Sequence, residues 1–250
     1  MRRISLMIMT AVALFSAAQS AQADTIAFFT DFNSGAPAQF SGVTTVAAVP
    51  GGLSGMGPAG NTFGGQLLVN NTGGPNGQAG SPTTLTLTGL GAHTAIDLNF
   101  LLVAIDSWDG APGSFPQNDI LDIRVDGVLV FSKSFANQSG TSDYTPPAGG
   151  LLSGPANLGF NAAYFDSAYN MYLEPTLGNI AHTASSVSIA WNAHGVGWQG
   201  GEDESWGLDN VQVVLRDTST SVPEPTSLVL LGLGSSFLAG IRWKAKRNKD

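Results

Sequence analysis

The strongest constraint on the fold is the alternation of apolar and polar residues over short stretches that end in turn residues. Residues 119–125 and 128–135 both alternate in this way, and only Asp126-Gly127 separates them. A two-residue Asp-Gly link favours a β-hairpin because both positions tolerate the positive φ angles of a tight turn. Residues 24–217 show almost no helical periodicity and are punctuated by Gly and Pro. The sequence therefore predicts an all-β domain.

Six further stretches have the length and composition of strands: residues 25–31, 66–70, 83–88, 95–106, 185–192 and 208–216. The fourth of these becomes wholly apolar at Phe100, as expected of a central strand that is covered on both faces. About eight strands fit one jelly-roll-like sandwich of two packed antiparallel sheets, which we place at residues 24–217. The Gly-rich residues 50–65, 73–81 and 140–157 are interpreted as surface loops.

The N-terminus has the pattern of a secretory signal peptide. Two arginines precede an apolar run at residues 4–18, and Ala21-Gln22-Ala23 offers a cleavage site of small residues before Asp24. An uncleaved membrane helix is disfavoured because the run is shorter than the roughly 20 residues that span a bilayer. Residues 1–23 are therefore predicted to direct the chain to the secretion machinery and to be removed.

The C-terminus, residues 218–250, contains a linker and then three features in order. The tetrapeptide Val222-Pro223-Glu224-Pro225 comes first, and an apolar stretch at residues 228–241 follows it. A basic cluster then ends the chain, with Arg242, Lys244, Lys246 and Arg247 among its members. An apolar stretch followed at once by basic residues is typical of a short transmembrane helix that leaves its charged end in the cytoplasm.

These three parts resemble the PEP-CTERM sorting signal of exported bacterial proteins. The resemblance implies recognition by an exosortase and removal of the tail near the Pro-Glu-Pro motif. It also implies delivery to the cell surface or the extracellular polysaccharide matrix after transient anchoring by the helix. The alternative is an ordinary single-span anchor, which also leaves the domain facing outward.

Charge and cysteine content exclude several function classes. The chain has no cysteine, which rules out disulfides, thiol nucleophiles and Cys-ligated zinc. Its formal net charge is -8, but residues 24–221 alone hold three basic residues against sixteen acidic ones, a net charge of −13. Nucleic acid is therefore an unsuitable partner, because binding it requires clustered Lys and Arg. Such negative charge opposes compactness unless cations offset it, which makes bound calcium a reasonable hypothesis.

A candidate calcium site joins the two ends of the domain. By strand parity, Asp31 aligns with Phe29 and Asp209 aligns with Val211, which would point both carboxylates toward a core. An inward carboxylate needs a cation or several hydrogen-bond donors to offset its desolvation. A calcium ion would satisfy both carboxylates if the first and last strands are neighbours.

The residues around these aspartates resemble concanavalin-like jelly rolls, MAM-type domains and carbohydrate-binding β-sandwiches. Those folds open on Asp-Phe-Glu/Asn-Ser-Gly and close on Trp-Gly-x-Asp-Asn/Asp-Val, and this chain has DFNSG at residues 31–35 and WGLDNV at residues 206–211. The resemblance implies Asp31, Asn33 and Asp209 as metal ligands, with Asn33 in place of the commoner Glu. The alternative is that both aspartates cap turns just beyond the sheet.

Three tryptophans are candidates for glycan contact. Trp108 lies in an acidic group at residues 106–110, and Trp198 and Trp206 flank the acidic residues 202–204. An indole at a loop tip can stack on a sugar ring, but it can also fold back over the edge of the core. The spacing of the aspartates at residues 106–122 lacks the ligand order of an EF-hand.

The sequence contains no catalytic motif. His93, His182 and His194 lack the spacing of a zinc-hydrolase motif, and neither a nucleophile elbow nor a phosphate-binding loop with Lys occurs. The favoured function is a non-enzymatic, exported sandwich that contacts glycan or matrix, with calcium as its candidate cofactor. One alternative is a glycan-active hydrolase or lyase that uses carboxylates near Trp108 or at residues 202–204. A third hypothesis is a structural, self-assembling surface protein.

Overall fold

The computed structural model describes residues 24–73, 77–111 and 118–217. The predicted signal peptide (1–23), the Pro-Glu-Pro motif, the apolar helix (228–241) and the basic tail all lie outside these residues. Within the described residues, no helix has the length and apolar character needed to cross a membrane.

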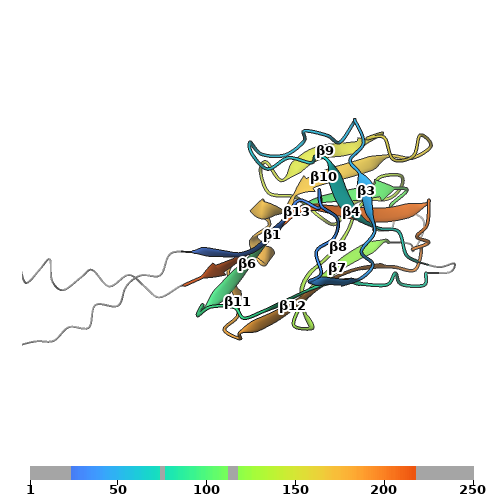
Figure 1. Ribbon diagram of the computed structural model, residues 1–250. Helices are drawn as coiled ribbons and strands as arrows, with labels where there is room; N and C mark the ends of the chain where they lie inside the picture. Colours follow the sequence, from blue (N-terminus) through green and yellow to red (C-terminus); the bar gives the residue numbers. More distant parts are fainter. Residues whose placement is uncertain (1–23, 74–76, 112–117, 218–250) are drawn as a thin grey trace, which may run out of the picture. The chain divides into compact units, whose positions relative to one another are not determined.

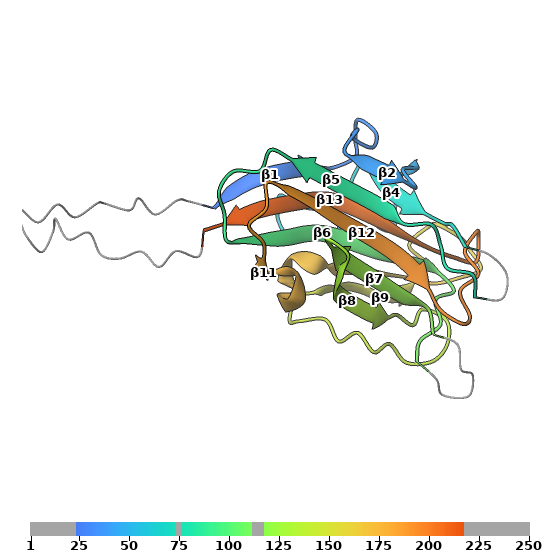
Figure 2. The same cartoon turned by 90° about the horizontal axis from the view of Figure 1, so that it is seen from below.

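The described residues form two antiparallel sheets, which confirms the all-β prediction (Figures 1 and 2). The first sheet has eight strands: β1 (Thr25–Thr30), β3 (Val46–Ala48), β4 (Gln66–Asn70), β6 (Ala95–Asp106), β9 (Leu151–Ala156), β10 (Asp166–Asn170), β11 (Ile180–Ala181) and β13 (Glu204–Arg216). The second has five: β2 (Phe40–Gly42), β5 (Thr83–Thr88), β7 (Ile120–Val125), β8 (Val128–Ser134) and β12 (Ser186–His194). Two short 3₁₀ turns, η1 (Met171–Leu173) and η2 (Pro175–Leu177), follow β10.

Strand order places sequence-distant segments together. The larger sheet runs β3-β4-β13-β6-β10-β9, with β1 also on β13 and β11 also on β6. The smaller sheet runs β2-β5-β12-β7-β8. β1 and β13 pair from Thr25 opposite Leu215 to Thr30 opposite Val211, so the first and last strands are neighbours, as the calcium hypothesis requires (Figure 1).

The predicted hairpin is present between β7 and β8, and its turn residues Asp126 and Gly127 both have positive φ angles, +49° and +80°. Five strands were not predicted from the sequence: β2, β3, β9, β10 and β11. Of these, β9 lies within residues 140–157, which were interpreted as a surface loop. Gly154 and Pro155 lie within β9, and β9 pairs only with β10 at the edge of the sheet. An edge position tolerates Pro because one side of the strand needs no hydrogen-bond donor.

Two apolar clusters cover the two faces of the larger sheet. The main core lies between the sheets and includes Leu102 of β6 and Leu208 of β13, which pair across the sheet. The second cluster lies on the outer face, where Leu101 and Val103 pack against Leu53 and other loop residues. β6 is therefore covered on both sides, as its apolar run predicts. Residues 50–65 are accordingly a covering layer rather than a free loop. The described members of both clusters all belong to the sandwich.

Candidate functional site

The predicted calcium ligands meet where β13 changes its neighbour. Residues Trp206 to Leu208 of β13 pair with β4, whereas Val211 to Leu215 pair with β1. Between these segments the register with β6 shifts after Asp209, and Asn210 takes a positive φ of 51°. The loop that leaves β1 and the loop that enters β4 therefore converge beside Asp209.

Asp209 is a fully buried carboxyl group with hydrogen-bond donors on both oxygens. The Gly64 N–H donates to Oδ2 at 3.2 Å, and the Asn210 N–H donates to Oδ1 at 2.7 Å. Burial raises the pKa of Asp209 to about 7, and the negative charge of Asp31 raises it further while the two N–H groups lower it. The Asp31 carboxylate therefore lies close enough to Asp209 to affect its ionisation.

Asn33 links the two loops at this junction. Its Oδ1 accepts the Gln66 N–H at 2.9 Å, and its Nδ2 donates to Oδ2 of Asp31 at 2.8 Å. A Cβ atom at Gly65, where φ is +65°, would lie 1.7 Å from Oδ1 of Asn33. Glycine at position 65 therefore leaves the space that the Asn33 amide occupies.

Strand parity does not align these two carboxylates with Phe29 and Val211 as predicted, because the register shifts in β1 and β13. Phe28, not Phe29, packs against the main core, and Phe29 is 51% exposed because the register of β1 shifts between Ile26 and Phe28. Asp209 lies opposite Leu101, a residue of the outer cluster, so it faces the outer side of the larger sheet. Its burial comes from the loop that contains Gly64.

The donor set at this junction suits calcium in type. Two carboxylates and an amide oxygen are hard oxygen ligands, and calcium also takes backbone carbonyl oxygens and water. Nowhere in residues 24–73, 77–111 and 118–217 do three or more His, Asp or Glu side chains converge on one metal position. A calcium ion here would therefore rely on Asp31, Asp209 and the Asn33 amide, completed by ligands other than charged side chains.

The three tryptophans are not surface platforms, which corrects their interpretation as glycan contacts. Trp108 and Trp198 are 0% exposed and Trp206 is 1% exposed. The Trp108 Nε1–H donates to the carbonyl of Ser205 at 2.6 Å, and the Trp198 Nε1–H donates to the carbonyl of Thr72 at 3.0 Å. Both indoles also meet edge to face, with ring centroids 5.0 Å apart. Trp108 and Trp198 thus lie in the core, where the polar atom of each indole has a carbonyl partner.

The carboxyl groups beside these tryptophans are also mostly enclosed. Asp119 precedes β7 and Glu204 opens β13, so one comes from each sheet, and the negative charge of Asp119 adds to the effect of burial on Glu204. Burial raises the pKa of Glu204 to about 8 and that of Asp119 to about 6. The Gln199 N–H donates to Oε2 of Glu204, and the Asp109 N–H donates to Oδ2 of Asp119, each at 2.6 Å. Below neutral pH the pair therefore holds at least one proton.

Asp106 is a buried acidic residue that lines an open space. It has a positive φ of 66°, and burial together with nearby Asp166, Asp203 and Glu202 raises its pKa to about 7. It shares a cavity of about 460 Å³ with Glu202, Asn71, Asn161 and other residues. Of the acidic residues 202–204, only the first two thus border open space, since Glu204 is buried.

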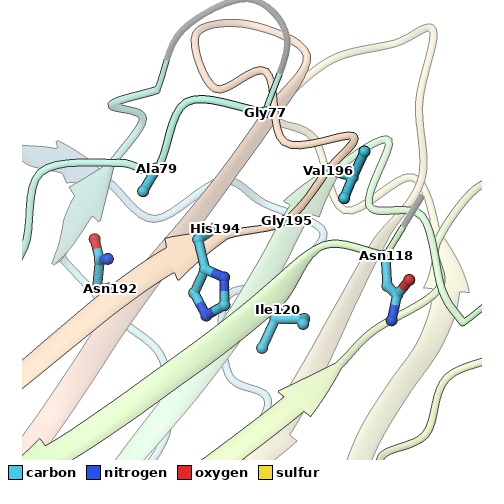
Figure 3. Close-up of a pocket in the computed structure, with 8 residues that line it drawn as sticks. All are labelled: Gly77, Ala79, Asn118, Ile120, Asn192, His194, Gly195 and Val196. Carbon is cyan, nitrogen blue, oxygen red and sulfur yellow. The ribbon is translucent and has the colours of Figure 1, made fainter. Parts of the chain in front are cut away.

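A larger cavity of about 600 Å³ lies on the five-stranded sheet and was missed at the sequence level (Figure 3). Its side chains come from the ends of two adjacent strands, β12 and β7, and from flanking loops: Asn192, His194, Ile120, Asn118, Ala79 and Val196. Figure 3 shows Asn192 and His194 projecting from the same strand end, with Ile120 beside His194. The alternation of residues 186–194 was the available signal, since it separates an apolar face from a polar one.

Three polar atoms at this cavity and directly beside it lack a well-directed partner. Oδ1 of Asn192, Nε2 of His194 and Oδ1 of Asp122 are buried without a hydrogen bond. Nε2 of His194 lies 3.3 Å from Oδ1 of Asp122, which is an ion-pair distance when the ring is protonated. A buried polar group without a partner costs about 1–3 kcal/mol, so these three atoms make this strand end less stable than a fully hydrogen-bonded one.

Comparison with known proteins identifies the tail. Residues 221–247 match the PEP-CTERM protein-sorting motif. This PEP-CTERM motif indicates a protein that is exported and sorted to the cell surface. No curated protein matches the chain.

Two solved structures resemble the sandwich at low identity. The CBM22-1 xylan-binding domain of Paenibacillus barcinonensis Xyn10C has 11% identity and a TM-score of 0.34, over 80% of this chain and 100% of that one. The K3 cleaved adhesin domain of Lys-gingipain from Porphyromonas gingivalis w83 has 14% identity and a TM-score of 0.36, over 76% of this chain and 99% of that one. At these TM-scores neither structure carries an argument about function.

Proposed function

We propose that this protein is a non-enzymatic, exosortase-processed surface protein whose sandwich contacts polysaccharide through the outer face of its five-stranded sheet. The PEP-CTERM motif supplies the location, since exosortase processing follows from that motif. The observation that carries the binding role is the cavity at the ends of β12 and β7, which the polar side chains of Asn118, Asn192 and His194 line.

Polar side chains on the outer face of the smaller sheet are further support for a hydroxyl-rich ligand. Cross-strand pairs put short polar side chains in adjacent rows: Ser41 beside Thr84, Thr86 beside Ser188, Thr88 beside Ser186, and Asn192 beside Asp122. Hydroxyl, amide and carboxylate groups offer both donors and acceptors, as sugar hydroxyls require. The cavity of about 600 Å³ lies within the range of about 300–1,000 Å³ that ligand sites occupy.

We propose calcium as a structural cofactor of the sandwich, bound by Asp31, Asn33 and Asp209. The support is the fully buried Asp209 carboxyl and the glycine at position 65 that admits the Asn33 amide. Because Asp209 has no ion pair within the described residues, a cation would offset its desolvation. The ion would join the loops beside the first and last strands and so stabilise the sandwich.

The experiment is affinity electrophoresis of residues 24–217 through gels that contain the extracellular polysaccharide of the producing cells. We expect the sandwich to be retarded, and Asn192→Ala combined with His194→Ala to weaken binding about tenfold, as the loss of two ligand hydrogen bonds implies. Ser54→Ala is the matched control, because Ser54 is exposed on the loop over the other sheet. Equal retardation of all three proteins would contradict the site. An absence of retardation combined with self-association of the sandwich would favour the structural, self-assembling role instead.

A glycan-active hydrolase or lyase is the second candidate, and the Asp106 cavity is the observation that favours it. A carboxyl group with a pKa of about 7 can act as a general acid, and Glu202 borders the same cavity. Release of new reducing ends from the polysaccharide, lost in both Asp106→Asn and Glu202→Gln, would establish this activity. Binding without any turnover would exclude it.

A further inference from the structure

Two buried histidines face each other at the end of the sandwich from which the chain leaves β13. His93 lies in the loop between β5 and β6, and His182 follows β11. The side chains are enclosed, with 7% and 8% of each residue exposed. Nε2 of His93 and Nδ1 of His182 are 2.6 Å apart, and the rings are inclined by 14°.

Among the described residues, the contacts of the remaining nitrogen of each ring are all with acceptors. Nδ1 of His93 lies 2.7 Å from the carbonyl of Gly91. Nε2 of His182 lies 3.1 Å from the carbonyl of Ser186 and 3.2 Å from Oδ2 of Asp126. Carbonyl and carboxylate oxygens cannot donate to a ring nitrogen, so both of these nitrogens must carry a proton.

This arrangement fixes the protonation of the pair. If both rings were neutral, the two nitrogens that face each other would present only lone pairs at 2.6 Å, which is repulsive. If both rings were fully protonated, two N–H groups would point at each other. One additional proton, shared between Nε2 of His93 and Nδ1 of His182, makes every contact a hydrogen bond.

We propose that His93 and His182 share one proton and act as a proton-dependent clasp at the end of the sandwich where β13 ends. The pair joins the β5–β6 loop, the β11–β12 connection and the β7–β8 turn. The clasp closes when the pair holds one proton and weakens when it holds none or two. No part of this inference depends on the glycan or calcium proposals.

The charged groups around the pair favour the singly protonated form. Asp126, on the β7–β8 turn, faces His182 directly and also accepts the Ser188 N–H at 2.8 Å. On β13, the Arg216 side chain is already paired with Asp97 of β6 and with Asp24. The positive charge shared by the two rings is therefore balanced by the Asp126 carboxylate.

The clasp is connected to the end of β13 through main-chain contacts. The His182 N–H donates to the carbonyl of Thr94 at 3.2 Å, and the Thr94 N–H donates to the carbonyl of Arg216 at 2.9 Å. Arg216 is the last residue of β13, and the PEP-CTERM motif begins at residue 221. Opening the clasp would therefore loosen the strand end that carries the tail.

A double-mutant cycle over pH tests the clasp. The free energy of unfolding of residues 24–217 is measured by urea titration for wild type, His93→Gln, His182→Gln and the double variant. We expect the coupling between positions 93 and 182 to change the folding equilibrium about tenfold at intermediate pH and to decline on both the acidic and the basic side. The cycle cancels the titration of every other group, and His194→Gln should leave the coupling unchanged. A coupling that is absent or constant with pH would overturn the proposal.

A second readout does not depend on variants that fold. In ¹⁵N-histidine NMR spectra of the wild-type sandwich, a shared proton gives one strongly deshielded signal that correlates with nitrogens of both rings. We expect this signal at intermediate pH and its loss at both extremes. Two rings that titrate independently, each with its own tautomer pattern, would overturn the clasp.

Discussion

The two ends of the sandwich are each closed by a pair of buried titratable groups, but the pairs have opposite chemistry. At one end, the Asp119–Glu204 pair lies beside Trp108 and Trp198 and becomes more negative as it loses protons. At the other end, the His93–His182 pair can only be neutral or positive. Burial opposes ionisation of the carboxyl pair, whereas the two facing ring nitrogens of the histidine pair favour one shared proton. The stability of this one domain is therefore expected to depend on pH in two distinct ways.

The largest expected effect comes from breaking the indole packing at the carboxyl end. Trp108→Ala should lower the free energy of unfolding by about 3–5 kcal/mol, because it opens a cavity and leaves the Ser205 carbonyl without its donor. Leu90→Ala, partly buried at the histidine end, should cost only about 1 kcal/mol. Urea unfolding of both variants measures the contrast. Equal losses would show that the two ends contribute alike.

The carboxyl pair should make the domain less stable as pH rises. The pKa of Glu204 is about 8 in the folded state against 4.5 in the unfolded chain, so the folded state retains its proton longer. This contribution is fully present below pH 4.5 and is lost as pH rises through about 8.

The corresponding measurement is urea unfolding of wild type and Glu204→Gln from pH 5 to pH 8. Wild type should lose on the order of 2–3 kcal/mol over this range through the pair. Glu204→Gln stays neutral at every pH, so much of this slope should disappear. A wild-type slope that survives the substitution in full would assign it to other groups, Asp106 among them.

Calcium should have an intermediate effect on stability. Its proposed site at Asp31, Asn33 and Asp209 lies between the two ends of the sandwich. Excess calcium over chelator should stabilise wild type by about 2–3 kcal/mol when the ion is near 100 times its dissociation constant. Asp209→Asn should remove most of this gain in thermal melts. Asp143→Asn, at a half-exposed carboxylate elsewhere, should keep it, which separates a site from general screening of the acidic domain. Equal melting temperatures with calcium and with chelator would contradict the calcium site.

The smallest effect on stability should come from removing the tail. Deletion of residues 222–250 leaves both apolar clusters intact, so the melting temperature of the sandwich should not change. The truncated protein should be released into the medium instead of being retained at the cell surface. Cell fractionation measures this. Unchanged retention would show that another segment holds the protein at the surface.

The sequence predicted the fold better than the site, for physical reasons. Alternation predicted the β7–β8 hairpin and the apolar run predicted that β6 is covered on both faces, because both signals are local. The junction of Asp31 and Asp209 was found through short motifs, but their orientation was not, because bulges in β1 and β13 reset strand parity. The interpretation of the tryptophans as glycan contacts was wrong, because residue type alone does not reveal a buried carbonyl partner.

The contact between His93 and His182 could not have been predicted from sequence, since 89 residues separate them and neither belongs to a motif. The same holds for the cavity beside Asn192 and His194. Its walls come from two strands and three loops whose approach depends on sheet topology. Both features arise from tertiary packing rather than from a local pattern.

The most direct test of the central claim is an NMR titration of the ¹⁵N-labelled sandwich with oligosaccharides from the extracellular polysaccharide of the producing cells. The account predicts chemical-shift changes that cluster on the outer face of the five-stranded sheet, at Ser188, Asn192, His194 and Asp122. Changes that cluster instead around the Asp106 cavity, or an absence of changes at any residue, would contradict it.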